Sequence, residues 1–106
     1  MNVLAKELKH SFRALADTSR LKILYELAGH DEMQVSDLAR MIKISQPLIS
    51  WHLRKLRRAG LIHSRRVGRQ VMCSLNRTQI RECEALLVTL LGNDSSPTGC
   101  TRRLPN

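Results

Sequence analysis

Basic side chains dominate the middle of this 106-residue chain. No acidic residue occurs between Asp37 and Glu82, yet that interval holds 11 of the 18 Lys and Arg residues. The whole chain has nine acidic residues and a formal net charge of +9. Guanidinium and ammonium groups without neighbouring carboxylates attract polyanions, with nucleic acid first and acidic membranes second. The charge pattern therefore favours a nucleic-acid-binding surface over a basic run that only improves solubility.

Residues that could catalyse a reaction or hold a metal ion show no comparable grouping. The sequence contains no nucleophile paired with a base, no Gly-rich phosphate loop and no cluster of carboxylates. The histidines lack the short spacing of metal ligands; they are His10, His30, His52 and His63. We therefore expect no enzyme, no cofactor and no metal site.

Three cysteines, Cys73, Cys83 and Cys100, cannot all pair within one chain. The expectation in a reducing cytosol is three free thiols. Cys83 falls on the apolar face of a predicted helix, where it is either a small buried hydrophobic residue or a redox-sensitive thiol. Both interpretations stay open on the sequence.

Two amphipathic helices are predicted before residue 30. The first covers 4–15, with an apolar stripe of Leu4, Leu8, Phe12 and Leu15. Asp17 or Thr18 can cap the second helix, and Gly29 ends it. Its expected inward positions are Leu21, Leu24, Leu27 and Ala28.

Two further helices are predicted on either side of a short turn. Ser36 can cap a helix that ends at residue 42, and the turn 43–45 follows it. Ser45 then caps a helix over 46–59, in which Pro47 is tolerated because first-turn amides have no helical acceptor. Its expected inward stripe is Ile49, Leu53 and Leu56.

Beyond residue 60 the apolar period changes from helical to alternating. The segments 61–66 and 70–75 predict a two-stranded hairpin with Gly68 in its turn. Asn76, with Gln79 three residues later, resembles the capping box of a fifth helix that runs to about residue 91. The expected fold is mainly α with one small β-hairpin, in a single domain over 1–92. Residues 93–106 are rich in Ser, Pro, Gly and Thr and predict a flexible tail.

The helices 36–42 and 46–59, joined by a three-residue turn, fit a helix-turn-helix. A basic hairpin directly after the second helix predicts the winged form of this motif. An α-helix fits the DNA major groove, and a basic hairpin can follow the backbone into the adjacent minor groove. The wing carries three candidate contacts: Arg65, Arg66 and Arg69.

A helical projection of 46–59 separates an apolar face from a polar one at about 100° per residue. Gln46 and Ser50 lie near the N-terminus, where side chains reach base edges, and Arg54 and Arg58 suit phosphate or guanine. Pro47 and Trp51 share this face, and Trp51 either packs on a neighbouring segment or contacts a thymine methyl or the DNA backbone. His52 lies near the core boundary, where a packed, hydrogen-bonded side chain is favoured over a ligand.

With these elements in order, the chain resembles the ArsR/SmtB family of winged-helix repressors over about 12–75. Four stretches and the wing residues 65–69 carry the resemblance: 12–21 (FRALADTSRL), 35–39 (VSDLA), 45–47 with 50–53 (SQP and SWHL) and 56–62 (LRRAGLI). The resemblance implies a homodimer held by the first and last helices, and operator binding that an inducer weakens. It also implies that Gln46, Ser50 and the wing arginines read DNA.

The chain departs from the family pattern at the metal sites. The metal-sensing branch has a Cys-x-Cys pair where this chain has Gln34 and Ser36, and a second family site uses Asp and His on the last helix, whereas no His follows His63. We therefore expect the inducer to be something other than a metal bound at these sites.

No apolar run approaches the ~18–20 residues of a membrane span, and the first residues lack the pattern of a signal peptide. The sequence thus predicts a cytoplasmic protein that binds double-stranded DNA. Two alternatives remain: a repressor that senses oxidants through Cys83, and a winged helix that binds another protein.

Overall fold

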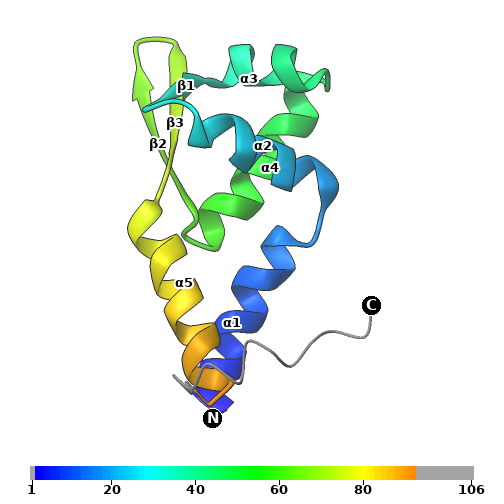
Figure 1. Cartoon of the computed structure of the whole chain (residues 1–106). Helices are drawn as coiled ribbons and strands as arrows, with labels where there is room; N and C mark the ends of the chain where they lie inside the picture. Colours follow the sequence, from blue (N-terminus) through cyan, green and yellow to red (C-terminus); the bar gives the residue numbers. More distant parts are fainter. Residues whose placement is uncertain (1, 93–106) are drawn as a thin grey trace.

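The computed structural model describes residues 2–92, so the predicted tail 93–106, with Cys100, lies outside the described residues. Five helices and three strands occur between residues 2 and 92 (Figure 1). In chain order they are α1 (Asn2–Leu15), α2 (Thr18–Ala28), β1 (Met33–Gln34), α3 (Val35–Ile42), α4 (Gln46–Arg58), β2 (Ile62–Val67), β3 (Gln70–Leu75) and α5 (Arg77–Leu90). None of the helices within 2–92 is long and apolar enough to cross a bilayer.

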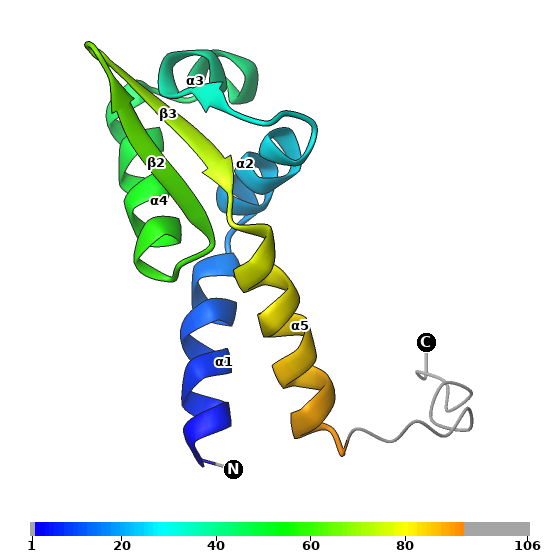
Figure 2. The same cartoon turned by 90° about the vertical axis from the view of Figure 1, so that its left-hand side faces the viewer.

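The elements divide into two ends of the molecule. Helices α1 and α5 lie side by side at one end, and α3 lies with the tip of the β2–β3 hairpin at the other (Figure 1). Figure 2 shows α4 alongside the hairpin, with α1 and α5 extending away from both. The predicted order of helices, hairpin and last helix is confirmed.

Polar side chains cap the N-termini of α2 and α4. The Asp17 carboxylate accepts from the backbone N–H of Arg20, and the Ser45 hydroxyl accepts from that of Leu48. These are the N-caps expected from the sequence, with Asp17 rather than Thr18 at α2. The predicted cap at Ser36 is wrong, because α3 begins at Val35 with Gln34 in the N-cap position, and the Ser36 hydroxyl donates to the Gln34 side chain instead.

The core is aliphatic and draws on α2, α3, α4 and the sheet, with Ala14 from the end of α1. Its most deeply buried members are Ile23, Leu27, Leu38, Ile49, Leu56, Leu61 and Cys73. The predicted inward face of α2 was wrong in part: Leu21 is 52% exposed and Ala28 is exposed too, whereas Ile23 is fully buried. Residues 23 and 27 are one helical turn apart and share a face, and that face meets α3, α4 and β3.

The sheet has one strand more than the sequence predicted. The two-residue β1 pairs antiparallel with β3, with Met33 opposite Cys73, so β3 is the central strand in the order β1-β3-β2. Two residues are too few to show a period, which is why the pattern did not reveal β1. The hairpin itself is confirmed, since Val67 pairs with Gln70 and Gly68 adopts a positive φ of 63° in the turn.

Asn76 joins the end of β3 and the start of α5 to the segment after α4. Its carboxamide oxygen accepts from the backbone N–H of Gln79, which is the expected cap of α5. The second half of the predicted capping box does not form: the Asn76 backbone N–H donates to the Leu61 carbonyl at 2.9 Å. The Asn76 carboxamide nitrogen donates to the Gly60 carbonyl, also at 2.9 Å.

Replacing Gly60 by Ala is expected to lower the free energy of unfolding by about 1–2 kcal/mol, the penalty of a left-handed non-glycine residue. Gly60 has φ +77°, and its added Cβ would lie 3.6 Å from the Gln79 side chain, so the penalty comes from the backbone and not from a clash. The measurement is urea unfolding followed by circular dichroism.

Gly29→Ala is the matched control because Gly29 also follows a helix but has φ −89°. Alanine at position 29 reduces the conformational entropy of the unfolded chain, which is expected to raise the free energy of unfolding by about 0.4–1 kcal/mol. Equal effects of the two substitutions would contradict the assignment of strain to Gly60.

Candidate nucleic-acid interface

The turn between α3 and α4 sets the angle at which α4 leaves the core. Lys43 ends α3 in a left-handed conformation with φ 66°, and its backbone N–H donates to the Ala39 carbonyl at 2.8 Å. Ile44 follows and packs against the core. Ser45 then caps α4, so a left-handed residue, an apolar anchor and a cap in sequence form the turn of the helix-turn-helix.

Helix α4 has one face in the core and one in solvent. Ile49, His52, Leu53 and Leu56 are buried, as the sequence predicted for the three aliphatic residues. Every DNA-contact candidate on this helix is exposed: Gln46, Pro47, Ser50, Trp51, Arg54 and Arg58. The helix is therefore anchored by its apolar face and presents its polar face outward.

A hollow of about 470 Å³, here called the wing-side hollow, separates α4 from the wing formed by β2 and β3. It brings together four of the predicted site residues from distant parts of the chain: Gln46, Ser50, Arg54 and Arg69. Arg57 also lines it and was missed by the sequence analysis. The Arg57 guanidinium donates to the Ser64 hydroxyl at 3.3 Å, an inter-element contact that no helical projection reveals.

Trp51 lies on the opposite side of α4 from the wing and is 44% exposed. Its ring stacks edge-on against the His52 ring, with centroids 5.1 Å apart. The Lys55 ammonium lies 4.9 Å from the Trp51 ring centroid and the Arg20 guanidinium 5.8 Å, within the range of cation–π attraction. Trp51 thus packs on neighbouring side chains and still presents part of its ring to solvent.

The wing arginines are not equivalent. Arg65 makes a bidentate pair with Glu32, with nitrogen–oxygen distances of 2.6 and 2.8 Å. Hydrogen bonding to Arg65 lowers the pKa of the Glu32 carboxyl. Among residues 2–92, Arg65 is the one wing arginine in an ion pair, whereas Arg66 and Arg69 extend into solvent. Any phosphate that approaches Arg65 must compete with Glu32.

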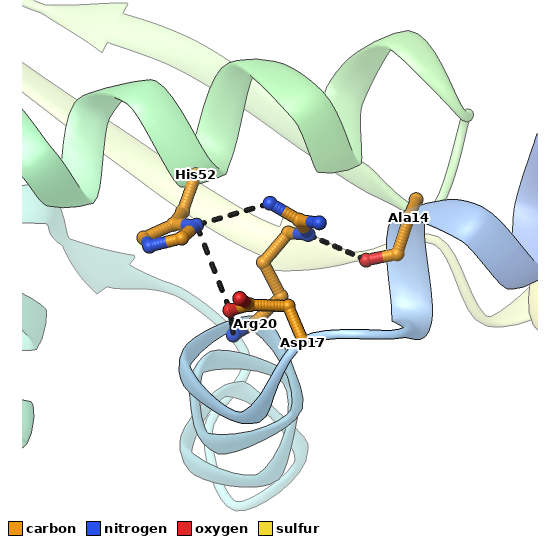
Figure 3. A network of polar contacts seen from close by, with 4 residues as sticks. All are labelled: Ala14, Asp17, Arg20 and His52. Carbon is orange, nitrogen blue, oxygen red and sulfur yellow. Dashed lines mark hydrogen bonds and ion pairs between the residues drawn. The ribbon is translucent and has the colours of Figure 1, made fainter.

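A polar network ties the buried face of α4 to the junction of α1 and α2 (Figure 3). The Arg20 guanidinium donates to the Ala14 carbonyl at 2.6 Å and to Nδ1 of His52 at 3.2 Å. A guanidinium only donates, so Nδ1 of His52 must accept and the neutral ring carries its proton on Nε2. The Asp17 carboxylate lies 3.9 Å from the same nitrogen. His52 is therefore a packed, hydrogen-bonded side chain, as expected.

Burial lowers the pKa of His52 below its ordinary value of 6.5, and Arg20 adds to this effect while Asp17 opposes it. Protonation would remove the acceptor of Arg20 and place two cations in contact. The neutral ring is consequently the form that this network holds.

The cysteines offer no shared site among the described residues. Cys73 is buried in β3, and burial raises the pKa of its thiol to about 11, which makes it unreactive. Cys83 is buried on α5, with 6% of its surface exposed. Within 2–92, no three His, Cys, Asp or Glu side chains lie close enough to hold a metal ion.

Comparison with known proteins shows the family to which this chain belongs. The family model described as "Bacterial regulatory protein, arsR family" matches residues 17–64. The chain is also 41% identical over 71 residues to the transcriptional repressor SdpR of Bacillus subtilis, covering 67% of this chain and 78% of SdpR. The chain belongs to the ArsR family. The resemblance found in the sequence is thereby confirmed.

Other relatives of this ArsR-family chain agree in fold. It is 45% identical over 71 residues to a transcriptional repressor SmtB homolog of Synechocystis. The aligned region covers 67% of this chain and 53% of that protein. The solution structure of a homodimeric winged helix-turn-helix DNA-binding domain from Mycobacterium bovis has a TM-score of 0.70 and 25% identity, covering 89% of this chain and 85% of the domain. These matches are transcriptional regulators and not enzymes, and they confirm the winged helix-turn-helix fold. The chain spans about half the length of the first curated relatives it matches, 54% and 53%.

The stability of this ArsR-family chain is expected to fall as pH drops from 7.5 to 5.5, because of His52. The folded pKa of His52 lies below the unfolded value of 6.5, so the folded state binds fewer protons. The contribution of neutral His52 is therefore complete above pH 6.5 and is lost as pH falls below it. His52→Gln is expected to weaken this pH dependence, measured by urea unfolding at both pH values and one protein concentration.

His63→Gln is the control, because His63 is exposed on β2 and outside the network. It should keep the pH dependence of the unaltered protein. An identical pH dependence in His52→Gln would show that His52 does not titrate in this window.

Proposed function

We propose that this chain is a sequence-specific transcriptional repressor that binds double-stranded DNA as a homodimer. The observation that carries the proposal is the outward face of α4, which presents polar side chains at its N-terminal end beside the basic wing-side hollow. An exposed helix such as α4 fits a major groove, and a basic hairpin such as β2–β3 can follow the backbone beside it. A DNA-binding role would make the cytoplasm its place of action.

The exposed residues divide by chemistry into two sets. Gln46 and Ser50, in the first turns of α4, can exchange hydrogen bonds with base edges. Arg54, Arg58, Arg66 and Arg69 can contact phosphates. Arg65 can do so only in competition with its hydrogen bonds to Glu32. Pro47 and the exposed part of Trp51 offer apolar surface to thymine methyl groups or sugars.

Dimerisation through α1 and α5 is supported by apolar side chains that the protomer leaves exposed there. They are Val3 at 69%, Phe12 at 40%, Val88 at 47% and Leu91 at 73%. The related domain from Mycobacterium bovis is described as homodimeric. A twofold pairing through these helices would set two copies of α4 about 34 Å apart, one turn of DNA.

The releasing signal is proposed to be something other than zinc or arsenite at the family's metal sites. Gln34 and Ser36 supply no thiolate where the metal-sensing branch has its cysteine pair. A redox role for Cys83 is the alternative, and it requires that an oxidant reach a side chain that the protomer buries.

Gln46→Ala is expected to reduce sequence preference, whereas Arg69→Ala should weaken binding to all sequences. Loss of one good base contact typically costs about 1–3 kcal/mol at a single base position. Loss of a phosphate contact should make the plot of log affinity against log salt less steep by about 1. The measurement is fluorescence anisotropy with operator and scrambled duplexes at several salt concentrations.

Two outcomes would contradict the proposal. If Gln46→Ala lowered both affinities equally, α4 would not be the base-reading element. If neither duplex bound, the winged helix would serve a protein partner instead.

Phe12→Glu is expected to convert the protein from dimer to monomer at micromolar concentration and to lower operator affinity. The substitution places a charge on the exposed apolar surface of α1, and sedimentation velocity measures the result. Tyr25→Glu is the control, since Tyr25 is 78% exposed on α2, away from α1 and α5. A monomeric unaltered protein would overturn the proposed dimer.

A further inference from the structure

A second basic hollow lies on the other side of α4 from the wing, between α4 and α1. We call it the α1-side hollow; its volume is about 280 Å³. Its lining is basic apart from one alanine and one tryptophan, and it consists of His10, Arg13, Ala14, Arg20, Trp51, Lys55 and Arg58. No carboxylate contributes to this lining. Only Trp51 and Arg58 of this set were expected from the sequence to contact DNA.

Three of the basic side chains around the α1-side hollow, His10, Arg20 and Lys55, make contacts that hold them in place. Arg20 is fixed by the Ala14 carbonyl and by His52, and both Arg20 and Lys55 lie against the Trp51 ring. Nε2 of His10 lies 3.3 Å from the carbonyl of Arg58, which ties α1 to the last turn of α4. These contacts involve neutral acceptors and an aromatic ring. The Asp17 carboxylate attracts Arg20 from outside the lining, whereas Arg13, Lys55 and Arg58 have no carboxylate in the hollow.

Phosphate is the ligand that suits such a lining. Guanidinium groups present several donors in a plane that matches phosphate oxygens, and an ammonium adds a mobile point charge. Arg13, Lys55 and Arg58 are three permanent cations that repel one another around one small hollow, and a bound anion relieves that repulsion. The half-exposed Trp51 ring adds an apolar wall of the kind that packs against a sugar.

The position of the α1-side hollow beside α4 indicates that the phosphates belong to a DNA backbone. Gln46, Ser50 and Arg54 of α4 line the wing-side hollow, whereas Trp51, Lys55 and Arg58 line the α1-side hollow. The two hollows therefore flank the same helix. An α-helix with its side chains is about 10–12 Å across, and the major groove is about 12 Å wide between its two phosphate backbones. A helix seated in the groove has one backbone on each side.

We propose that the α1-side hollow binds backbone phosphates of the DNA strand opposite the one that the wing follows. This inference rests on the proposed function and extends it. Arg13 and Lys55 are the residues it adds to the interface, and both are exposed. The α1–α4 junction then contributes to DNA affinity as well as to the connection between the helices.

Arg13→Gln and Lys55→Gln test the proposal in the full-length protein. Each is expected to weaken operator and scrambled duplexes by a similar factor and to make the salt dependence less steep by about 0.9 per lost contact. Lys22→Gln is the matched control, because it removes one exposed charge from α2 outside the hollow. It should leave the salt dependence unchanged. Circular dichroism and urea unfolding check that each variant folds.

Arg69→Gln separates failure of this inference from failure of the proposed function. If Arg69→Gln lowers affinity but Arg13→Gln and Lys55→Gln match Lys22→Gln, the α1-side hollow does not bind DNA. If all four variants match the unaltered protein, DNA binding by the winged helix itself fails.

Trp51 fluorescence distinguishes duplex phosphate from a free phosphorylated ligand, since Trp51 is the single tryptophan of the chain. A scrambled duplex should change this fluorescence, and Arg13→Gln should diminish the change. Pyrophosphate at micromolar concentration should leave it unaltered. Saturable quenching by micromolar pyrophosphate that is lost in Arg13→Gln would overturn the assignment to DNA and make the hollow a site for a small phosphorylated molecule.

Discussion

The 13 residues of helix α4 form one apolar face and one polar face. One face has to be apolar enough to bind the helix to α2, α3 and the sheet, and the other has to stay polar and outside. The buried Ile49, Leu53 and Leu56 form the apolar face. Because that face cannot rotate out of the core without exposing three aliphatic side chains, the register of the outward face is fixed. The placement of the basic residues in the interface depends on this single anchoring.

Local features of this arrangement could be predicted from the sequence, and long-range ones could not. The caps at Asp17, Ser45 and Asn76 follow from side-chain chemistry within three residues, and the inner stripe of α4 follows from the helical period. The pairing of β1 with β3 and the contact between Glu32 and Arg65 bring together residues more than 30 positions apart. Neither leaves a periodic trace in the sequence.

The candidate site shows the same division. A helical projection placed Gln46, Ser50 and Arg54 on one surface correctly, but it treated everything on that surface as one group. The structure separates Trp51 and Arg58 from the wing-side residues and joins them to Arg13 and Arg20. Charge counting emphasised the acid-free middle of the chain and so overlooked Arg13 of α1, which lies outside that interval in the sequence but beside α4 in the fold. It also could not show that Glu32 offsets Arg65.

The hydrogen bonds of Asn76 have a mechanical consequence. One side chain holds the start of α5 through Gln79 and the exit of α4 through Gly60, while its backbone N–H holds Leu61. Asn76 thus joins the first turn of α5 to the residues that follow α4 by three hydrogen bonds. No flexible linker separates these elements, so a change in the tilt of α5 would act directly on the base of the wing and the end of α4.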